Sequence, residues 1–245
     1  MSGLMLGIDS SAVSGACAVC FQGDHFDILG EQFINTKHTH SQTLLPMVES
    51  VMKCTEVRPC DLEGGIAVTV GPGSFTGLRI GIATAKGIAV GHDLPCIAVS
   101  SLEALAYNFV GNEAVVCCAM NARGGQIFNA LFDVNGYKVT RLCEDRIIKI
   151  AEFNEQGMSP VGELYDELAA FTGKVILVGD DAPMLHTLTD GRYELAPKHL
   201  RFILGSSVCR AAVDKPFTDP AALMPTYLRL PQAERERLAR EQGAK

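Results

Sequence analysis

The chain has 245 residues, of which 47% are hydrophobic and 20% are charged. This composition excludes a disordered chain, a coiled coil and a collagen-like repeat. The 21 basic and 28 acidic residues give a net charge of −7, whereas a protein that binds nucleic acid alone usually has a basic surface. We therefore expect any contact with RNA to be local or to go through a partner.

Neither an export signal nor a membrane span is expected. The first basic residue is Lys37, so the charged start of a signal peptide is missing. The longest uncharged stretch, residues 64–78, is shorter than the ~20 apolar residues of a spanning helix. The nine cysteines mostly lie in apolar runs. They predict buried, reduced thiols and a cytoplasmic protein.

The first half of the chain predicts eight elements in the order βββαβαβα. Short turns join the first three strands, which favours antiparallel pairing, and Ser100 or Ser101 is expected to cap the last helix. The expected strands are 4–9, 15–21, 26–34, 66–70 and 96–99, and the helices are 41–54, 78–90 and 101–109.

The second half repeats this order of elements without a similar sequence. Its expected strands are 114–120, 126–133, 137–144, 174–178 and 193–195, and its helices are 161–171, 182–188 and 199–213. We expect a mixed sheet with flanking helices in each half and a cleft between the halves. The predicted lobes are 1–110 and 111–230, with the boundary near Gly111, and a charged tail at 231–245 is expected to be a peripheral helix.

A glycine-rich loop joins strand 66–70 to helix 78–90. Its position suits a phosphate loop, but its spacing fits neither the dinucleotide fingerprint nor the P-loop. We interpret it as a structural turn in which Ser74 or Thr76 caps the helix. The residues assigned to this structural loop are Gly71, Gly73, Ser74, Thr76 and Gly77.

Two polar turns carry weaker signals. The turn after the first strand could hold Mg²⁺ and phosphate, or it could simply close a hairpin. The turn after strand 174–178 could contact an adenosine or cap the next helix. The candidate residues are Asp9, Ser10, Ser11, Gly179 and Asp180, with Asp181 beside them.

Metal, redox and hydrolase motifs are incomplete. Cys17 and Cys20 lie three positions apart on a strand, which places their thiols on opposite faces. Cys117 and Cys118 are adjacent on a strand, so their thiols also point to opposite faces. His40 is expected to make a local hydrogen bond rather than to bind a metal. No nucleophile elbow or HExxH motif occurs. The residues thus offer no complete set of catalytic groups and no metal site.

Two helices of the first half differ in pattern. Helix 41–54 is an ordinary amphipathic helix, whereas helix 78–90 is apolar on two opposite faces. The bulkier face consists of Leu78, Ile82, Ala85 and Ala89, and the smaller one of Ile80, Ala83 and Gly87. A helix of this kind is buried on both sides, either within one large domain or between its own sheet and another protein. The pattern alone leaves both alternatives open.

Several motifs together resemble the TsaB (YeaZ) family of bacterial tRNA threonylcarbamoyladenosine proteins. The resemblance extends from Met5 to about Glu234, and the string from Gly71 to Arg79 is highly specific. The matching segments are residues 7–11, 40–41, 44–46, 71–81, 85–87, 122–123 and 225–229.

The resemblance implies the two-lobed actin/Hsp70-like (ASKHA) fold and a subunit without chemistry of its own. It implies pairing with a catalytic TsaD subunit and a TsaE ATPase, which together transfer a threonylcarbamoyl group to the adenosine 3′ of the anticodon. ATP and Mg²⁺ would serve the complex, and tRNA would bind only through it. The implied pairing surface is the two first-lobe helices, assigned here to Leu44, Met47, Val48, Val51, Ile80, Ala83 and Gly87.

Two departures from the family pattern argue against an intact nucleotide site. Asn121 stands where an acidic residue is common, and only Gly179 precedes Asp180 in the late loop. The leading hypothesis is therefore a non-catalytic scaffold or activator, which could form a homodimer when its partner is absent. The alternative is an actin-fold ATPase or phosphotransferase, while a peptidase lacks the residues for its chemistry.

Overall fold

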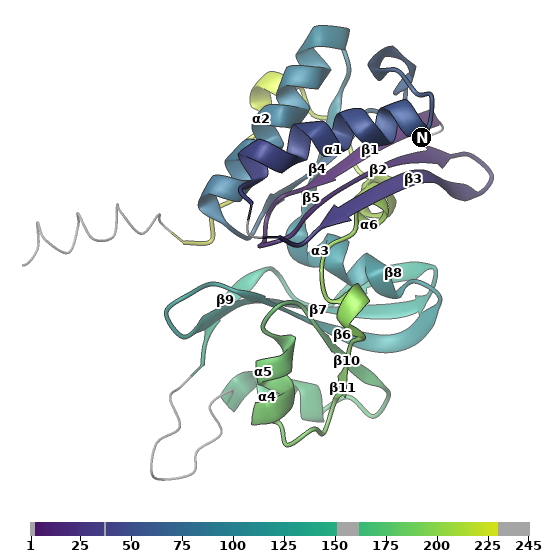
Figure 1. Ribbon diagram of the computed structural model, residues 1–245. Coiled ribbons are helices and arrows are strands. Elements are labelled where there is room, and N and C mark those ends of the chain that lie inside the picture. Colours follow the sequence, from purple (N-terminus) through teal and green to yellow (C-terminus); the bar gives the residue numbers. More distant parts are fainter. Residues whose placement is uncertain (1–2, 37, 151–161, 230–245) are drawn as a thin grey trace, which may run out of the picture.

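The first sheet forms from the apolar segments β1 (Gly3–Asp9), β2 (Gly15–Gln22), β3 (Phe26–Ile34), β4 (Ile66–Gly71) and β5 (Cys96–Ser100). Their order is β3-β2-β1-β4-β5; β1, β2 and β3 pair antiparallel, and β4 and β5 run parallel to β1. Parallel neighbours need a crossover connection, which α1 (His40–Cys54) and α2 (Phe75–His92) provide. The computed structural model describes residues 3–36, 38–150 and 162–229 (Figure 1).

The second sheet repeats this topology. Its order, β11-β10-β6-β7-β8, again places the first strand of the lobe in the middle, with the hairpin strands on one side and the parallel strands on the other. The strands are β6 (Asn112–Asn121), β7 (Gln126–Gly136), β8 (Lys138–Arg141), β10 (Val175–Val178) and β11 (Glu194–Leu195). The repeated topology confirms the predicted actin/Hsp70-like fold class with two mixed sheets.

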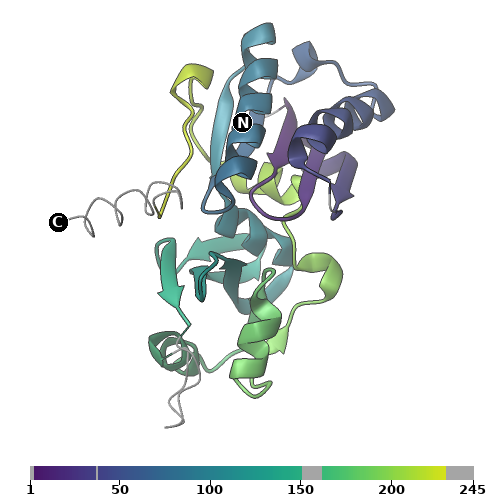
Figure 2. The ribbon, with the colours of Figure 1, turned by 60° about the vertical axis from the view of Figure 1, so that its left-hand side comes forward.

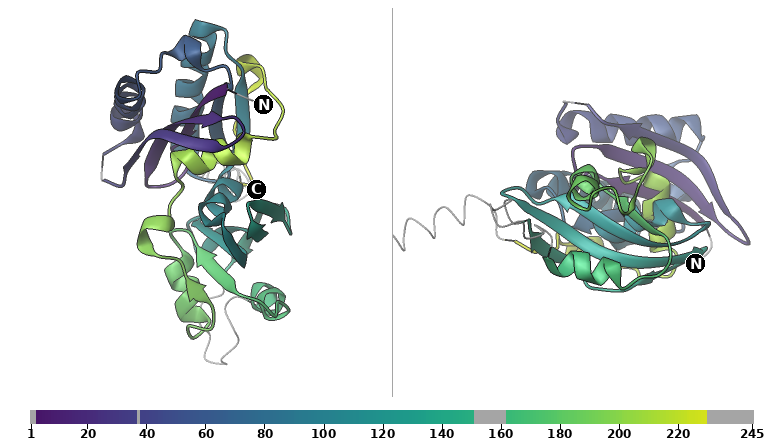
Figure 3. Two further views of the ribbon diagram at one scale, coloured as in Figure 1. Left: turned by 90° about the vertical axis from the view of Figure 1, so that its right-hand side faces the viewer. Right: turned by 90° about the horizontal axis from the view of Figure 1, so that it is seen from below.

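The remaining helices complete a layered arrangement (Figures 1 and 3). Helices α1 and α2 cover the outer face of the first sheet, and α4 (Gly162–Ala169) and α5 (Ala182–Leu188) cover the outer face of the second. Between the sheets lie α3 (Ser101–Ala106) and α6 (Gly205–Ala212), in a core shared by both lobes. Short 3₁₀ turns occupy Pro59–Asp61, Tyr107–Phe109, Lys198–Leu200 and Pro220–Ala222.

The predicted helix 199–213 is wrong in its first half. A 3₁₀ turn ends at Leu200, Leu204 is extended, and α6 begins only at Gly205. A side chain at Gly205 would collide with the backbone of Cys17 and Ala18 in β2. The helix therefore begins where a tertiary contact places it, and a sequence pattern does not show such a contact.

Other boundaries also differ from the prediction. Helix α2 begins at Phe75 rather than at residue 78, because the Ser74 side chain accepts a hydrogen bond from the Gly77 N–H. The predicted strand 137–144 is shorter, ending at Arg141, and an additional strand, β9 (Arg146–Lys149), pairs with β7. The strand β9 has only four residues, three half-buried and one exposed, and this pattern is too weak to predict a strand.

The end of the chain returns to the first lobe. Helix α6 packs against β1 and β2, Thr218 pairs with Cys96 of β5, and the Thr226 N–H donates to the Val70 carbonyl at 2.7 Å. These segments of the predicted second lobe, 111–230, thus pack against the first sheet. The limits of the two lobes remain a prediction. The predicted tail helix, 231–245, lies outside the described residues. Among the described helices none is both long and apolar enough to span a membrane.

Candidate functional site

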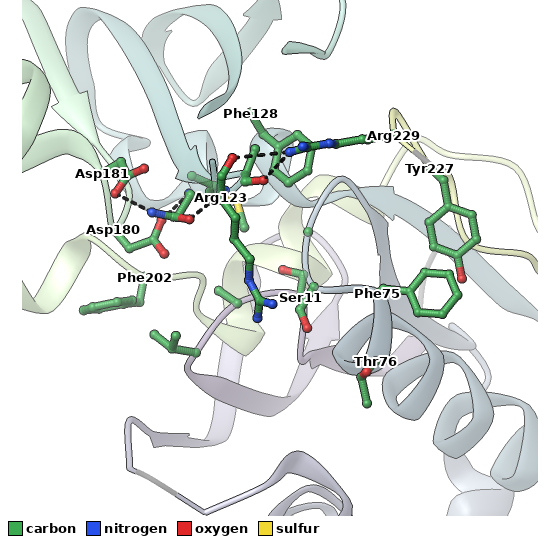
Figure 4. Close-up of a pocket in the computed structure, with 17 residues that line it drawn as sticks. Ser11, Phe75, Thr76, Arg123, Phe128, Asp180, Asp181, Phe202, Tyr227 and Arg229 are labelled. Carbon is green, nitrogen blue, oxygen red and sulfur yellow. Dashed lines mark hydrogen bonds between the residues drawn. The ribbon is translucent and has the colours of Figure 1, made fainter. Parts of the chain in front are cut away.

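A cleft of about 520 Å³ opens between the two lobes (Figure 4). The first lobe contributes the β1–β2 turn and the loop before α2, and the second lobe contributes the ends of β6 and β10. Aromatic, acidic and basic side chains share its wall. The cleft is lined by Ser11, Ala12, Val13, Gly73, Ser74, Phe75, Thr76, Met120, Asn121, Ala122, Arg123, Phe128, Asp180, Asp181, Phe202, Tyr227 and Arg229.

The glycine-rich loop packs tightly on the β1–β2 turn. A Cβ atom at Gly73 would collide with the Ser11 carbonyl, and one at Gly77 with the Ser10 carbonyl. The Ser10 hydroxyl also donates to the Gly77 carbonyl oxygen at 2.9 Å. The loop therefore uses its glycines to bring two backbones together, as expected for a structural loop, while the exposed Thr76 faces the cleft.

Asp9 is fully buried and does not line the cleft. Its Oδ1 atom accepts hydrogen bonds from the Ser11 hydroxyl at 2.6 Å, the Ser11 N–H at 3.1 Å and the Thr69 hydroxyl at 2.7 Å. Its Oδ2 atom has no hydrogen-bond partner in the structure. Burial raises the pKa of this carboxyl, although the hydrogen bonds from Ser11 and Thr69 oppose the shift. Asp9 thus stabilises its own turn rather than facing a ligand.

The second-lobe wall holds two neighbouring carboxylates. Asn121 binds both: its N–H donates to Asp180 Oδ1 at 2.9 Å, and its Nδ2 donates to Asp181 Oδ1 at 3.0 Å. Burial raises the pKa of Asp180, and the nearby Asp181 adds to that shift; burial also raises the pKa of Asp181. Gly179 has a φ of +118°, and a side chain there would collide with the Ala119 carbonyl. A negative pair at this wall repels a phosphate group.

Arg123 reaches into the cleft from a fixed turn. Its φ is +61°, its N–H donates to Asn121 Oδ1 at 2.8 Å, and Arg229 Nη1 donates to the carbonyl oxygens of Ala122 and Arg123. Figure 4 shows the Arg123 side chain directed toward the Ser11 turn. The polar groups of the two lobes thus approach one another here, but acidic and basic groups are mixed.

The other candidate motifs are structural. Cys17 and Cys20 lie in different cores, as do Cys117 and Cys118, which confirms that their thiols point to opposite faces. All nine cysteines are free. His40 makes a hydrogen bond, but not the expected local one: its Nε2 atom lies 2.8 Å from the carbonyl oxygen of Ala12, 28 residues earlier in the chain. Within residues 3–36, 38–150 and 162–229, no three His, Cys, Asp or Glu side chains are placed to hold a metal ion.

The assignment of the apolar α1 residues to a partner surface is wrong. Leu44, Met47, Val48 and Val51 are at most 3% exposed and belong to the core between α1, α2 and the first sheet. A 3.6-residue pattern shows which side of a helix is buried but not what covers it. Here the chain's own sheet covers that side.

Within the described part of the chain, only one of the two apolar faces of α2 is covered. The bulkier face, Leu78, Ile82, Ala85 and Ala89, is buried in the first lobe. On the opposite face Ala83 and Gly87 are exposed and Ile80 is half-buried. A Cβ atom added at Gly87 would meet no atom within 4 Å. The smaller face is therefore open for contact with another molecule.

One cluster has no counterpart in the sequence-based assignments. Tyr227 stacks on Phe75, with 4.9 Å between the ring centroids, and accepts a hydrogen bond from Arg79 Nε at 2.9 Å. The Arg79 guanidinium lies 3.8 Å from the Phe75 ring centroid. Both segments belong to the motifs that carry the family resemblance, and this was the available signal for the cluster. Because 148 residues separate Arg79 from Tyr227, the sequence does not show that they are in contact.

Comparison with protein-family models finds one match. The model for TsaD, tRNA N6-adenosine threonylcarbamoyltransferase, matches residues 27–238. This is most of the chain, although β1 and β2 of the first sheet precede the matched range.

Individual proteins agree with this match. The chain is 28% identical over 219 residues to the tRNA threonylcarbamoyladenosine biosynthesis protein TsaB of Bacillus subtilis, covering 84% of this chain and 87% of that protein. It is 36% identical over 141 residues to TsaB of Escherichia coli, covering 54% and 57% of the two chains. The solved structure of YeaZ from Pseudomonas aeruginosa superposes with a TM-score of 0.70 at 20% identity, covering 93% of this chain and all of that one.

Proposed function

The chain belongs to the TsaB (YeaZ) branch of the TsaD-like family, and we propose that it is a non-catalytic subunit in the formation of threonylcarbamoyladenosine in tRNA. In this role it pairs with a TsaD-like transferase subunit and activates or positions it. The observation that carries the proposal is the contrast between a cleft whose polar groups bind one another and an open face of small residues on α2.

The position of Asp9 supports a role without chemistry of its own. This carboxylate follows the first strand, where an acidic residue could hold a metal ion for phosphate chemistry. It is instead fully buried and accepts three hydrogen bonds at Oδ1 from its own lobe. A metal ion in the cleft would gain no ligand from it.

The acidic pair supports the same conclusion. Asn121 holds Asp180 and Asp181 against the end of β6, so both carboxylates stay at the cleft wall. Their charges oppose binding of a nucleotide phosphate at this place. The cofactor therefore belongs to the complex, where a TsaE-like ATPase would use ATP and Mg²⁺, rather than to this subunit.

The outer face of α2 is the proposed pairing surface. Ala83 and Gly87 are small and exposed, so the backbone of a partner helix can approach closely. Since the chain matches the model of the transferase itself, its partner would have the same fold and could present equivalent helices. The net charge of −7 fits a subunit that meets tRNA through its partners, in the cytoplasm.

A pull-down from cell extract tests the pairing. With the chain as bait, the TsaD-like subunit is expected among the captured proteins, and an extract of cells that lack that subunit serves as the control. If the extract contains the TsaD-like subunit but that subunit is not among the captured proteins, the proposal is contradicted.

One alternative, an ATPase with its own nucleotide site, is favoured by the volume of the cleft, about 520 Å³. A turnover assay of the purified chain with Mg-ATP separates the two functions. The scaffold predicts no steady hydrolysis. Hydrolysis that disappears in Asp9→Ala would establish the ATPase instead.

A further inference from the structure

A segment near the end of the chain runs along α2. Residues 219–227, here called the strap, lie on one side of α2, while α1 lies on the other (Figure 2). The strap is attached at both ends: Lys86 Nζ donates to the Ala221 carbonyl at 3.2 Å, and Arg79 Nε donates to the Tyr227 hydroxyl at 2.9 Å. Between these attachments the Thr226 N–H bonds to the Val70 carbonyl. The strap is thus a fixed neighbour of α2.

Neighbouring residues of the strap point in opposite directions. Leu223 is 1% exposed and packs into the core beneath α2. Met224 is 67% exposed, between the two attachment points. Burying Leu223 fixes the strap, and Met224 then projects from a surface that is already held in place.

Exposed apolar side chains lie on both the strap and the outer face of α2. Residues 220–226 contain no charged side chain, and Ala83, Gly87 and Val90 of α2 are exposed. The cationic groups on the strap side of α2, Arg79 and Lys86, are bonded to the strap itself. Single exposed apolar residues are common, but here they lie on two neighbouring elements, beside cations whose donors are already bonded to the strap.

We propose that the strap forms a second wall of the partner surface on α2 and that Met224 is an anchor that packs against the transferase subunit. This inference rests on the proposed function, since it takes the outer face of α2 as the pairing surface. It adds a segment more than a hundred residues away in sequence, to which neither the family match nor the helix pattern assigns a contact.

The chemistry of the surface indicates its occupant. Small residues at 83 and 87 leave room for a crossing helix, and Met224 on the neighbouring strap has a flexible, polarizable side chain that can fill irregular gaps. The chain matches the transferase model over residues 27–238, so a transferase subunit would offer helices of the same fold for this pairing. We therefore assign the occupant as a helix of the TsaD-like subunit.

The test compares three variants by isothermal titration of the purified chain with the purified TsaD-like subunit. Met224→Glu places a charge on the strap, Ala83→Glu places one on α2, and Tyr137→Glu is the matched control. Tyr137 is 83% exposed in the turn between β7 and β8 of the second lobe. Thermal melting of each variant shows that it is folded.

We expect Met224→Glu to weaken binding about tenfold or more, while Tyr137→Glu binds like the wild type. Adding the transferase should also slow amide hydrogen exchange in residues 219–227. If Ala83→Glu fails to bind but Met224→Glu binds normally, the strap lies outside the interface and this inference is wrong, whereas the proposed function stands. If Ala83→Glu and Met224→Glu both bind normally, the proposed pairing surface on α2 is wrong as well. A defect of Met224→Glu only in self-association would assign the strap to a second copy of this chain and would also overturn the inference.

Discussion

The cleft between the lobes and the outer face of α2 are opposite kinds of surface. In the cleft, Asn121 binds the neighbouring carboxylates Asp180 and Asp181, and Arg229 holds the backbone of the opposite turn. On α2, Ala83 and Gly87 are exposed, and the cationic side chains beside them, Arg79 and Lys86, are bonded to Tyr227 and Ala221. The cleft holds polar groups that are engaged with one another, and the helix face holds small residues that no part of the described chain covers.

This difference indicates which of the two surfaces gains free energy by binding another molecule. A ligand in the cleft must first displace hydrogen bonds that already satisfy its wall, and leaving buried polar groups unpaired is costly. A partner on α2 only removes apolar surface from water, which is favourable. The contrast therefore favours a subunit that acts by binding a protein, and each prediction below is designed to break or sharpen it.

The largest expected effect is that of Ala83→Glu. A charge buried without a partner at a helix contact costs several kcal/mol, which corresponds to at least about a hundredfold loss of affinity. Because Ala83 is exposed in the isolated chain, the variant should melt like the wild type. Titration with the TsaD-like subunit and a melting curve check both expectations. A variant that binds normally would exclude this face of α2.

A matched pair on α1 tests which side of that helix is buried by the chain itself. Leu44 is 1% exposed and Leu45 is 47% exposed. We expect Leu44→Ala to lower the free energy of unfolding by about 2–5 kcal/mol, because it leaves a cavity in the core. Leu45→Ala should change stability by no more than about 0.5 kcal/mol. Denaturant titration of both variants measures the difference, and equal effects would contradict the assigned core.

The buried carboxyl of Asp9 predicts a pH-dependent effect. Its pKa is raised in the folded state, so protonation favours folding. This contribution is complete below the unfolded pKa, about 3.9, and is lost as the pH rises through the higher folded value. Asn cannot ionise, so the Tm of Asp9→Asn relative to the wild type should increase from pH 4 to pH 8. A Tm difference that does not vary with pH would show that Asp9 is not the group whose pKa is raised.

The smallest effect is expected for tRNA. Phosphate contacts dominate affinity for nucleic acids and need clustered basic groups, whereas the chain has a net charge of −7. The isolated chain should bind tRNA no more tightly than about 1 µM at physiological salt, measured by fluorescence anisotropy. Tighter, salt-sensitive binding without partners would reveal a local basic patch.

The fold was predictable from the sequence to a large extent. Strand lengths, short turns and two repeats of one element order were sufficient for the two sheets, and the opposite faces of α2 followed from residue spacing. The late start of α6 was not predictable, because it depends on how closely Gly205 approaches the backbone of Cys17 and Ala18. Neither was the return of the last segment to the first lobe.

The candidate site was predictable only in part. The sequence correctly predicts a structural loop before α2 with Ser74 or Thr76 as its helix cap, and the structure shows that Ser74 is the cap. It does not show that Ser11 and Thr69 donate hydrogen bonds to the buried Asp9, since these bonds form only in the folded chain. The apolar face of α1 was assigned to a partner because periodicity does not distinguish the chain's own sheet from another protein.

The central claim is that pairing through α2, rather than chemistry in the cleft, carries the function of this chain. The most direct measurement is the amount of threonylcarbamoyladenosine in total tRNA from cells in which the gene is replaced by a variant. Ala83→Glu is expected to abolish the modification, and Arg123→Ala, which removes a charge from the cleft, should leave it near the wild-type level. Loss of the modification in Arg123→Ala together with its retention in Ala83→Glu would contradict the claim.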